Sequence, residues 1–410
     1  MSDSPRSTVT CDVLVVGAGP AGIAAALELH RSGLDVLVID KATFPRDKCC
    51  GDGLTTGALR VLESLDFDPA LVPSWTPTSD VWLRSPSGRE MSMPLPSGKG
   101  TFAAIAPRLE FDDALVRTAI DRGVRVAQGV TFTQISSMND DGVVVSVDGL
   151  GDVHCGYVVA ADGMWSPTRK MLGVATEGYL GEWHAFRQYL GNVTGPAAEE
   201  LHVWFEPDLL PGYAWSFPLP GNRANFGFGI LREENHSVQH MNELWRDLLA
   251  RPHIVSALGD GFVAEGRHTA WPIPARVDSA VRSAGRVLFV GDAVCATDLL
   301  TGEGIGQALE TGMLAAQAIT EGASPADVRA RYSKLLDRHF LADHRMSSTL
   351  GRMLGRRGVA ESVLRLVDTN GWTRRNFVRW MFEDEPRALV LTPRRWHRGF
   401  LKRPGAYAAR

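Results

Sequence analysis

The sequence predicts an α/β protein built on a parallel sheet, and three consecutive features support this fold class. An apolar run at Val13–Val16 is short enough for a buried strand, and a G-x-G-x-x-G pattern follows where strand would turn into helix. Ala24–Leu29 continues as a buried helix would, and Gly33 stands where that helix would end. A second apolar run, Val36–Ile39, then ends in Asp40. This order predicts a Rossmann-like β-α-β unit.

Each glycine of the loop has its own expected role. Gly17 permits the tight turn, Gly19 lets the backbone approach a pyrophosphate, and Gly22 lets the helix pack closely on the strand. The helix N-terminus offers free N–H groups and the positive end of its dipole. The carboxylate of Asp40 can accept hydrogen bonds from ribose hydroxyls. The unit therefore predicts a dinucleotide ligand.

Length and composition limit the remaining possibilities. A chain of 410 residues is too long for one compact core, so we expect two domains or one domain with a large insertion. The first ten residues contain no apolar signal core, and no stretch has the length and hydropathy of a membrane span. The five cysteines form neither a zinc spacing nor an even disulfide set, so we expect no metal site and a reducing, cytoplasmic environment.

The charge is unevenly distributed along the chain. Residues 331–410 carry 18 Lys or Arg against 7 Asp or Glu, which gives this tail +11, while residues 1–330 carry −15. A peripheral contact with anionic lipid and a solvated face over an acidic body both explain the tail, and the absence of a nucleic-acid-binding motif argues against nucleic acid. The basic residues alternate with aromatic ones at Trp372, Arg374, Arg375, Phe377, Arg379, Trp380, Arg394, Arg395, Trp396, Arg398 and Phe400.

The middle of the chain alternates between helical and strand patterns. Residues 76–106 predict short strands broken by Pro and Gly, and Pro107–Gly123 predicts an amphipathic helix followed by a strand at Arg125–Val130. Tyr157–Ala161 is another buried run. Residues 180–275 carry many aromatic side chains in short segments, which predicts an antiparallel sheet covering a pocket.

The last buried strand is expected at Gly285–Gly291, ahead of a long helix that ends near Ile319. Everything beyond Ser324 is expected to be helical and peripheral. We therefore expect a split nucleotide domain with an inserted substrate sheet. The nucleotide domain would comprise residues 1–75, 106–170 and 276–325, the antiparallel substrate sheet residues 76–105 and 171–275, and the basic helical C-terminal region residues 326–410.

Three signatures, GAGPAG at 17–22, ADG at 161–163 and VGD at 290–292, resemble the FAD-dependent oxidoreductases of the aromatic-hydroxylase type. The resemblance implies FAD as cofactor, with Asp162 near its pyrophosphate, Asp292 on its ribityl chain and Arg108 in contact with it. The cofactor-binding residues it implies are Gly17, Gly19, Gly22, Asp40, Lys41, Arg108, Asp162, Gly163, Gly291, Asp292, Gly302, Gly304 and Ile305.

Two further stretches resemble the geranylgeranyl reductase family. KCCGDGLT at 48–55 is similar to that family's Lys-x-Cys-Gly-Asp-Gly loop, and YAWSFPLPGNRANFGFG at 213–229 is similar to its Y-x-W-x-F-P and G-x-G signature in both spacing and type. AFRQYL at 185–190 resembles the preceding strand of its sheet. The resemblance covers about residues 10–325 and implies reduction of isoprenoid C=C bonds by hydride transfer from flavin N5.

The spacing of three aromatic residues agrees with such a substrate. Tyr213, Trp215 and Phe217 alternate, so in a strand they project from one face and can wall a groove for a prenyl chain. The π-faces of Tyr213 and Trp215 can stabilise positive charge that develops at the more substituted carbon. Cys50, Tyr213 and Asp298 are candidates for the proton source, with Cys50 preferred. The predicted catalytic residues are Cys50, Tyr213 and Trp215, and the predicted substrate-binding residues are Gly51, Asp52, Tyr213, Trp215 and Phe217.

One departure from the family pattern keeps alternatives open. Asp298-Leu299 stands where the family usually has Asn-Pro before the Gly302–Ile305 turn, whose helix N-terminus would face the flavin. Monooxygenases and halogenases share the three cofactor signatures, although no halogenase Gly-Glu-Ser loop is found, and a flavoprotein without redox function is a third possibility. No second dinucleotide motif is found, so the electron donor is open: NADPH that binds transiently, or a reductase or ferredoxin that docks on the protein.

Overall fold

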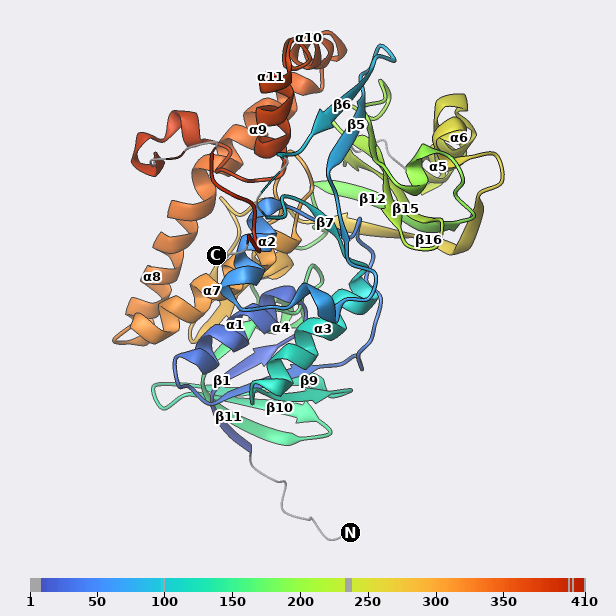
Figure 1. The fold of residues 1–410 in the computed structure, drawn as a ribbon. Coiled ribbons are helices and arrows are strands. Elements are labelled where there is room, and N and C mark those ends of the chain that lie inside the picture. Colours follow the sequence, from blue (N-terminus) through green and yellow to red (C-terminus); the bar gives the residue numbers. More distant parts are fainter. Residues whose placement is uncertain are drawn as a thin grey trace.

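The structure is a computed structural model that describes residues 9–96, 98, 100–232, 238–396, 399 and 402–408. Arg398 and Phe400 of the predicted basic tail lie outside the described residues. In Figure 1 a mainly parallel sheet lies at the bottom of the molecule and a second sheet lies at the upper right. The helices of the C-terminal region run along the left side to the top.

The predicted β-α-β unit is confirmed. It consists of β1 (Val9–Val16), α1 (Pro20–Arg31) and β2 (Val36–Asp40). β1 pairs in parallel with β2 on one side and with β11 (Gly151–Ala160) on the other. The second half of β1 is buried on both faces, as expected for a strand at the centre of a parallel sheet covered by helices.

Five parallel strands in the order β18-β11-β1-β2-β8 form the core of this first sheet. The antiparallel strands β9 and β10 extend it from β11, and β17 pairs with β18 at the edge. The bounds are β8 Arg125–Gln128, β9 Thr131–Met138, β10 Val143–Asp148, β17 Ser283–Ala284 and β18 Val287–Phe289.

Two long helices pack closely over this sheet. α7 (Ile305–Glu321) lies against α1, and a Cβ at Gly312 of α7 would stand only 2.2 Å from the carbonyl oxygen of Ala21. The glycine therefore permits close approach of the two helix backbones. The helix predicted at Pro107–Gly123 is found as α3. The remaining bounds here are α2 Thr56–Ser64, α3 Arg108–Asp121 and α4 Pro167–Met171.

The second sheet has the strand order β16-β12-β15-β14-β13-β5-β6. Its pairs are antiparallel, as predicted, except for β13 and β5, which run parallel and come from segments far apart in the chain. The predicted fold class is confirmed. The bounds are β5 Asp80–Arg84, β6 Glu90–Pro94, β12 Trp183–Gly191, β13 Leu201–Trp204, β14 Tyr213–Leu219, β15 Arg223–Leu231 and β16 Val263–Ile273.

Smaller elements complete this half of the molecule. A buried cluster that includes Phe186, Phe226, Phe228 and Trp245 forms where α5 packs on the second sheet. A separate three-stranded sheet has the order β3-β7-β4. The bounds are α5 Val238–Ala250, α6 Pro252–Leu258, β3 Gly53–Leu54, β4 Thr76–Pro77 and β7 Ala104–Ile105.

The C-terminal region is helical as predicted, but the expectation that all of it is peripheral is wrong. Arg379 and Arg387 are buried and form ion pairs with Asp384 and Asp298, so the end of this region packs into the body. Among the described residues, no helix combines the length and hydropathy needed to cross a membrane. The helices, orange to red in Figure 1, are α8 Pro325–Leu336, α9 Ala342–Leu354, α10 Arg357–Val367 and α11 Gly371–Met381.

Candidate active site

A cavity of about 1050 Å³, including its opening to solvent, lies between the two large sheets. Three segments far apart in the sequence form its walls. They are the loop at 48–53, the part of the second sheet formed by strands β14, β15, β12 and β16, and the segment 292–308 that leads into α7. Pro20 at the start of α1 also lines it, so the cavity reaches the glycine-rich loop of the β-α-β unit.

The aromatic side chains of β14 form one wall. Tyr213, Trp215 and Phe217 all line the cavity, and their ring centroids are 6.0 and 6.2 Å apart in succession. The predicted shared face of these residues is confirmed. Opposite them on β15, Gly229 pairs with Tyr213 and Gly227 with Trp215.

The G-x-G part of the signature has a steric explanation. A Cβ at Gly227 would lie 2.3 Å from Cζ2 of Trp215 and 2.5 Å from the carbonyl oxygen of Phe186. Only glycine leaves room there for the indole ring to lie across the hairpin. The ring is fixed further by its N–H, which donates to Oδ1 of Asn225 at 3.2 Å. The hairpin therefore determines the orientation of Trp215.

The 48–53 loop faces this aromatic wall. A Cβ at Gly51 would be 3.4 Å from the Phe217 ring, and one at Gly53 only 3.0 Å from it. The loop is held by Arg187 of β12, which donates to the carbonyl oxygen of Cys50 at 3.1 Å and to Asp47 at 2.8 Å. Burial raises the pKa of the Cys50 thiol to about 11, so this cavity-lining thiol is neutral at pH 7.

Asp52 does not line the cavity, although it was predicted to contact substrate. Its side chain is fully buried behind the loop, where it accepts hydrogen bonds from Tyr189 at 2.7 Å and from Asn225 at 2.8 Å. Burial raises its pKa to about 6, against the opposing charge of Arg187. Asn225 also binds the Trp215 indole, so Asp52 positions the aromatic wall through Asn225.

The glycines of the 17–22 loop differ in what surrounds them. A Cβ at Gly17 would lie 2.3 Å from the carbonyl oxygen of Ala161, and one at Gly22 only 1.9 Å from that of Gly17. At Gly19 the nearest atom is 3.7 Å away, in the Arg46 side chain. Gly17 and Gly22 are thus needed for packing, whereas Gly19 leaves space in front of the α1 N-terminus, which has no side-chain cap.

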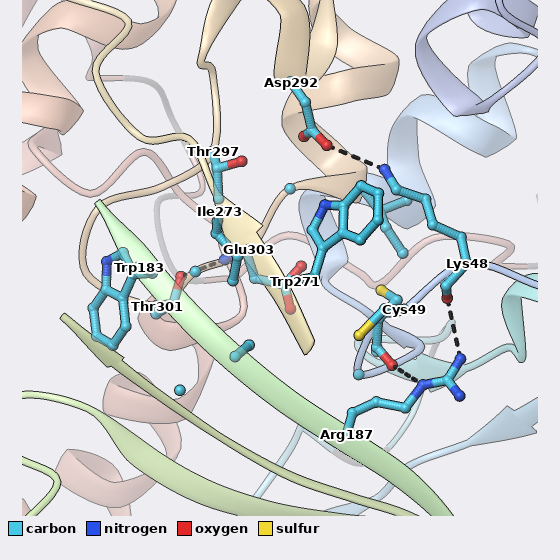
Figure 2. Close-up of a pocket in the computed structure, with 18 of the residues that line it drawn as sticks. Lys48, Cys49, Trp183, Arg187, Trp271, Ile273, Asp292, Thr297, Thr301 and Glu303 are labelled. Carbon is cyan, nitrogen blue, oxygen red and sulfur yellow. Dashed lines mark hydrogen bonds and ion pairs between the residues drawn. The ribbon is translucent and has the colours of Figure 1, made fainter. Parts of the chain in front are cut away.

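The segment 292–308 brings polar groups to the opposite wall. Asp292 lines the cavity and forms an ion pair with Lys48 at 3.1 Å (Figure 2). Gly302, Gly304 and Ile305 line it beside the N-terminus of α7, whose N-cap Gly304 supplies no side-chain hydrogen bond. Two uncapped helix N-termini, those of α1 and α7, therefore meet this cavity.

A family profile described as FAD binding domain matches residues 10–324. The chain is 34% identical to the menaquinone reductase of Mycolicibacterium smegmatis over 372 residues, 84% of each protein. The chain belongs to the geranylgeranyl reductase family of FAD-dependent oxidoreductases. It is 30% identical to digeranylgeranylglycerophospholipid reductase 2 of Methanopyrus kandleri over 79% of this chain and 80% of the relative. Its fold matches a geranylgeranyl bacteriochlorophyll reductase-like protein from Thermoplasma acidophilum with a TM-score of 0.77 and 21% identity, covering 95% of this chain and 100% of the other.

FAD is the cofactor of this family member, and the residues present fit it. Beside the 17–22 loop, Oδ2 of Asp162 accepts the N–H of Thr168, while the buried Oδ1 has no hydrogen-bond partner among the described residues. A buried acceptor without a donor is costly, so a ligand donor is expected there. Gly163 has φ +78°, and no atom lies within 4 Å of the position that a Cβ would take, which leaves room beside Asp162.

The other predicted cofactor residues lie in different positions relative to the cavity. Asp40 accepts the N–H groups of Ala18 and Ala42, both at 2.8 Å, and so holds the glycine loop against β2. Lys41 is exposed to solvent. Gly291 has φ +60° and turns the chain between β18 and Asp292. Arg108 lines the cavity but its guanidinium is bound by Asp112 at 2.7 Å.

The departure at Asp298-Leu299 has a structural explanation in the C-terminal region. Oδ1 of Asp298 accepts from the N–H of Thr301 at 2.8 Å, and its Oδ2 accepts from Arg387 at 3.0 Å. Although burial opposes it, the Arg387 charge holds the pKa of Asp298 below its usual range, so this carboxylate is ionised and fully bonded. Asp298 is not among the lining residues, and the Tyr213 hydroxyl is committed to the carbonyl oxygen of Thr301.

Sequence reasoning missed several residues of the cavity. Arg187 lay within the AFRQYL stretch and Glu303 within the Gly302–Ile305 turn, so both signals were present but unused. Lys48 is the first residue of the KCCGDGLT stretch, but its side chain was given no role. The others belong to no motif and come together only through the fold. No cluster of His, Cys, Asp or Glu among the described residues could hold a metal ion. The missed lining residues shown in Figure 2 are Lys48, Trp183, Arg187, Trp271, Ile273, Thr297, Thr301 and Glu303.

Proposed function

We propose that this enzyme reduces a C=C bond in an isoprenoid chain, with the prenyl side chain of a quinone as its first substrate. The observation that carries the proposal is the continuous row of Tyr213, Trp215 and Phe217 along a cavity that also meets the N-termini of α1 and α7. An apolar aromatic wall of this kind suits a long unsaturated chain. The names of its relatives, which include menaquinone and digeranylgeranylglycerophospholipid reductases, support the same substrate class.

The aromatic wall has a proposed role beyond binding. Trp215 and Tyr213 present π-faces to the chain, and such faces stabilise positive charge that develops on a substituted carbon. Phe217 continues this wall, and the glycines of the 48–53 loop pack against it. FAD supplies the hydride when it is bound and reduced. Cys50 faces the cavity with a neutral thiol and stays a candidate proton donor.

The proposed cofactor site uses the two helix N-termini and three signatures. Gly17 and Gly22 shape the loop, Gly19 leaves space for the pyrophosphate, Asp292 binds the ribityl chain, and Arg108 contacts the cofactor. Lys41, Asp40, Asp162 and Gly163 would border the nucleotide portion. We propose the division of the chain that the sequence predicts, with residues 1–75, 106–170 and 276–325 holding FAD, 76–105 and 171–275 holding substrate, and 326–410 forming the C-terminal region.

The electron donor is proposed to be NADPH or a ferredoxin. We also propose that the far end of the C-terminal helices, which includes α10 and α11, contacts the inner face of the membrane peripherally. Leu366 and Trp372 there are 67% and 66% exposed, and Arg365 and Arg375 are exposed beside them. Large apolar side chains among arginines suit an anionic lipid surface. Binding to anionic vesicles and not to neutral ones, weakened in Trp372→Ala, would support this contact.

The experiment that tests the function begins with the purified flavoprotein reduced without oxygen. It is mixed with menaquinone in detergent, with a geranylgeranylated glycerophospholipid, or with oxygen, and both flavin reoxidation and product mass are followed. Because a quinone ring itself accepts two electrons, the quinone product is reoxidised before its mass is taken. A retained gain of two hydrogens per bond is expected. Rapid reoxidation by oxygen with an oxygenated or halogenated product would instead establish a monooxygenase or halogenase, and no net substrate change would exclude the reductase.

A further inference from the structure

One carboxyl group on the cavity wall has no part in the interactions described so far. Glu303 lies in the turn before α7 and lines the cavity (Figure 2). Its backbone is fixed, since its N–H donates to Oγ1 of Thr301 and its carbonyl oxygen accepts the N–H of Asp298. Within the described part of the chain its carboxyl group makes no hydrogen bond and no ion pair. The group is therefore available to a molecule in the cavity.

The surroundings of Glu303 are rich in negative charge. Asp298, Glu303 and Glu383 form a cluster in which Arg387 is the cation. Arg387 binds Asp298 at 3.0 Å and lies 3.6 Å from Glu383. Glu383 also accepts from Thr55 at 3.0 Å and from Gln307 at 2.6 Å. Two of the three carboxyls thus have donors, and the third is left to face the cavity.

The basic side chains around the cavity do not pair with the carboxyl group of Glu303. Lys48 is paired with Asp292, Arg187 with Asp47, and Arg108 with Asp112. Asp343, the further acid near Arg387, is paired with Arg395. The other titratable groups that face Glu303 are the Cys50 thiol and the Tyr213 phenol, both neutral at pH 7. No cation of the described structure is therefore committed to Glu303.

This environment keeps Glu303 protonated near neutral pH. Burial, and then repulsion by Glu383, raise the pKa of Glu303 to about 8, while Arg387 opposes the shift. Burial likewise raises the pKa of Glu383 to about 7. The N-terminus of α7 favours the anion, but a helix terminus contributes less than the loss of hydration on burial. A neutral carboxyl facing an aromatic cavity is a proton donor.

We propose that the carboxyl group of Glu303 donates the proton to the substrate carbon during double-bond reduction. This inference rests on the proposed function. The π bond of the alkene breaks, and its electrons form a C–H bond with the proton from Glu303, whose O–H bond breaks. The neighbouring electron-deficient carbon accepts a hydride, the two-electron equivalent drawn from reduced flavin, which is oxidised. The carboxylate then recovers its proton from water.

Glu303 is better suited to this step than the three candidates from the sequence. Asp298 is ionised and holds no proton, and the Tyr213 hydroxyl donates to the carbonyl oxygen of Thr301. The Cys50 thiol is neutral, but with a pKa of about 11 it is a weaker acid than the carboxyl. General acids work best when their pKa lies near the working pH, which favours Glu303.

The first test needs no turnover. An infrared pH titration of the oxidised holoenzyme is expected to show a protonated carboxyl band that disappears between pH 7 and pH 9 in the wild type. Glu383, with a pKa of about 7, contributes to this band near pH 7, so it is the part that disappears around pH 8 that should be absent in Glu303→Gln and retained in Cys50→Ala. A band of equal intensity in Glu303→Gln would overturn the assignment of the neutral acid to Glu303.

The second test follows single turnover of the reduced enzyme with menaquinone as a function of pH. Above about pH 8 the wild-type rate is expected to fall about tenfold per pH unit, because the protonated fraction falls by that factor. Glu303→Gln should lose roughly 10²-fold or more at pH 7 and also lose this decline, and Glu303→Asp should recover part of the rate. If Cys50→Ala removes the decline and Glu303→Gln keeps it, the thiol is the donor and the proposal is wrong.

A further variant guards against a folding defect in Glu303→Gln. Glu383→Gln removes the repulsion that raises the pKa of Glu303, so the pH at which the rate declines should move downward. An unmoved decline would contradict the proposal. A wild type that saturates no prenyl bond would instead refute the proposed function and its proton step together, whereas an active wild type with an unaffected Glu303→Gln refutes the proton step alone.

Discussion

Two glycine-rich loops border the cavity, and they use glycine in different ways. In the 17–22 loop, a Cβ at Gly17 or Gly22 would meet backbone atoms at 2.3 and 1.9 Å. In the 48–53 loop, a Cβ at Gly51 or Gly53 would meet only the edges of aromatic rings, at 3.4 and 3.0 Å. Backbone atoms have little freedom to move, whereas a ring can shift by a few tenths of an ångström. The glycines of the first loop are therefore required for the fold, whereas those of the second loop affect only how closely the loop packs on the aromatic wall.

The largest effect is expected from Gly17→Ala. Its φ is +107°, and the added methyl group would stand 2.3 Å from the carbonyl oxygen of Ala161, so strain and a backbone clash act together. We expect a loss of soluble yield or of nearly all bound flavin, measured as flavin absorbance per mole of protein.

Gly33→Ala is the matched control for this prediction. Gly33 also has a positive φ, +86°, but no atom lies within 4 Å of its Cβ position. The control carries only the conformational strain, roughly 1 kcal/mol, and should retain flavin. Equal behaviour of the two variants would show that close packing at Ala161 does not matter.

Trp215→Ala tests the aromatic wall against which the 48–53 loop packs. It should keep its flavin because the indole belongs to the aromatic wall, but turnover on a prenyl substrate should fall by at least roughly 30-fold, the equivalent of about 2 kcal/mol of lost cation–π stabilisation. Trp372→Ala, at a position 66% exposed on α11, is the aromatic control and should turn over normally in detergent. Unchanged turnover in Trp215→Ala would move the substrate pocket elsewhere.

Asp292→Ala tests the cofactor side with a smaller expected effect than Gly17→Ala. The proposed hydrogen bond from the ribityl chain to the Asp292 carboxylate is worth roughly 1.5–3 kcal/mol, so FAD affinity should fall about tenfold to a hundredfold while the protein still folds. The measurement is flavin release on dilution or dialysis. Asp260→Ala, which replaces an exposed acid away from the cavity, should release flavin at the wild-type rate. Wild-type flavin retention in Asp292→Ala would remove the ribityl assignment.

Gly53→Ala sharpens the comparison, because it is expected to act only through Phe217. The methyl group would lie 3.0 Å from Cε2 of that ring, so the ring must give way slightly. A severalfold rise in KM for the prenyl substrate, roughly 1 kcal/mol or less, is expected without loss of flavin. If flavin is lost instead, the 48–53 loop is as rigid as the 17–22 loop and the contrast between them fails.

The parts of the molecule that the sequence predicted correctly are those specified by neighbouring residues. The β-α-β unit lies within residues 9–40, where apolar runs and glycines define each element locally. The face shared by Tyr213, Trp215 and Phe217 follows from strand alternation alone. Both predictions needed no knowledge of how distant segments pack.

The parts that could not be predicted depend on contacts between distant segments. Arg387, which lies 89 residues further along the chain, balances the buried negative charge of Asp298. From the charge pattern alone, this arginine is predicted to belong to a solvated or lipid-facing tail. The motif places Asp52 in a loop and predicts that it contacts substrate, whereas the fold buries it against Tyr189 and Asn225. Burial and pairing of a charge are decided by tertiary packing, which periodicity does not report.

Glu303→Gln also tests how the carboxyl group on the cavity wall responds to pH, and its expected effect is the smallest. The pKa of Glu303 rises from its usual 4.5 to about 8 in the fold, so the neutral carboxyl stabilises the protein fully below about pH 4.5. That contribution is lost as pH rises through 8. The Tm of the wild type relative to Glu303→Gln should therefore fall by roughly 2–5 °C between pH 5 and pH 9. Glu321→Gln, at the exposed end of α7, should follow the wild type. A constant Tm difference across this range would mean that Glu303 is already charged near neutral pH and that the cavity wall is more hydrated than its burial indicates.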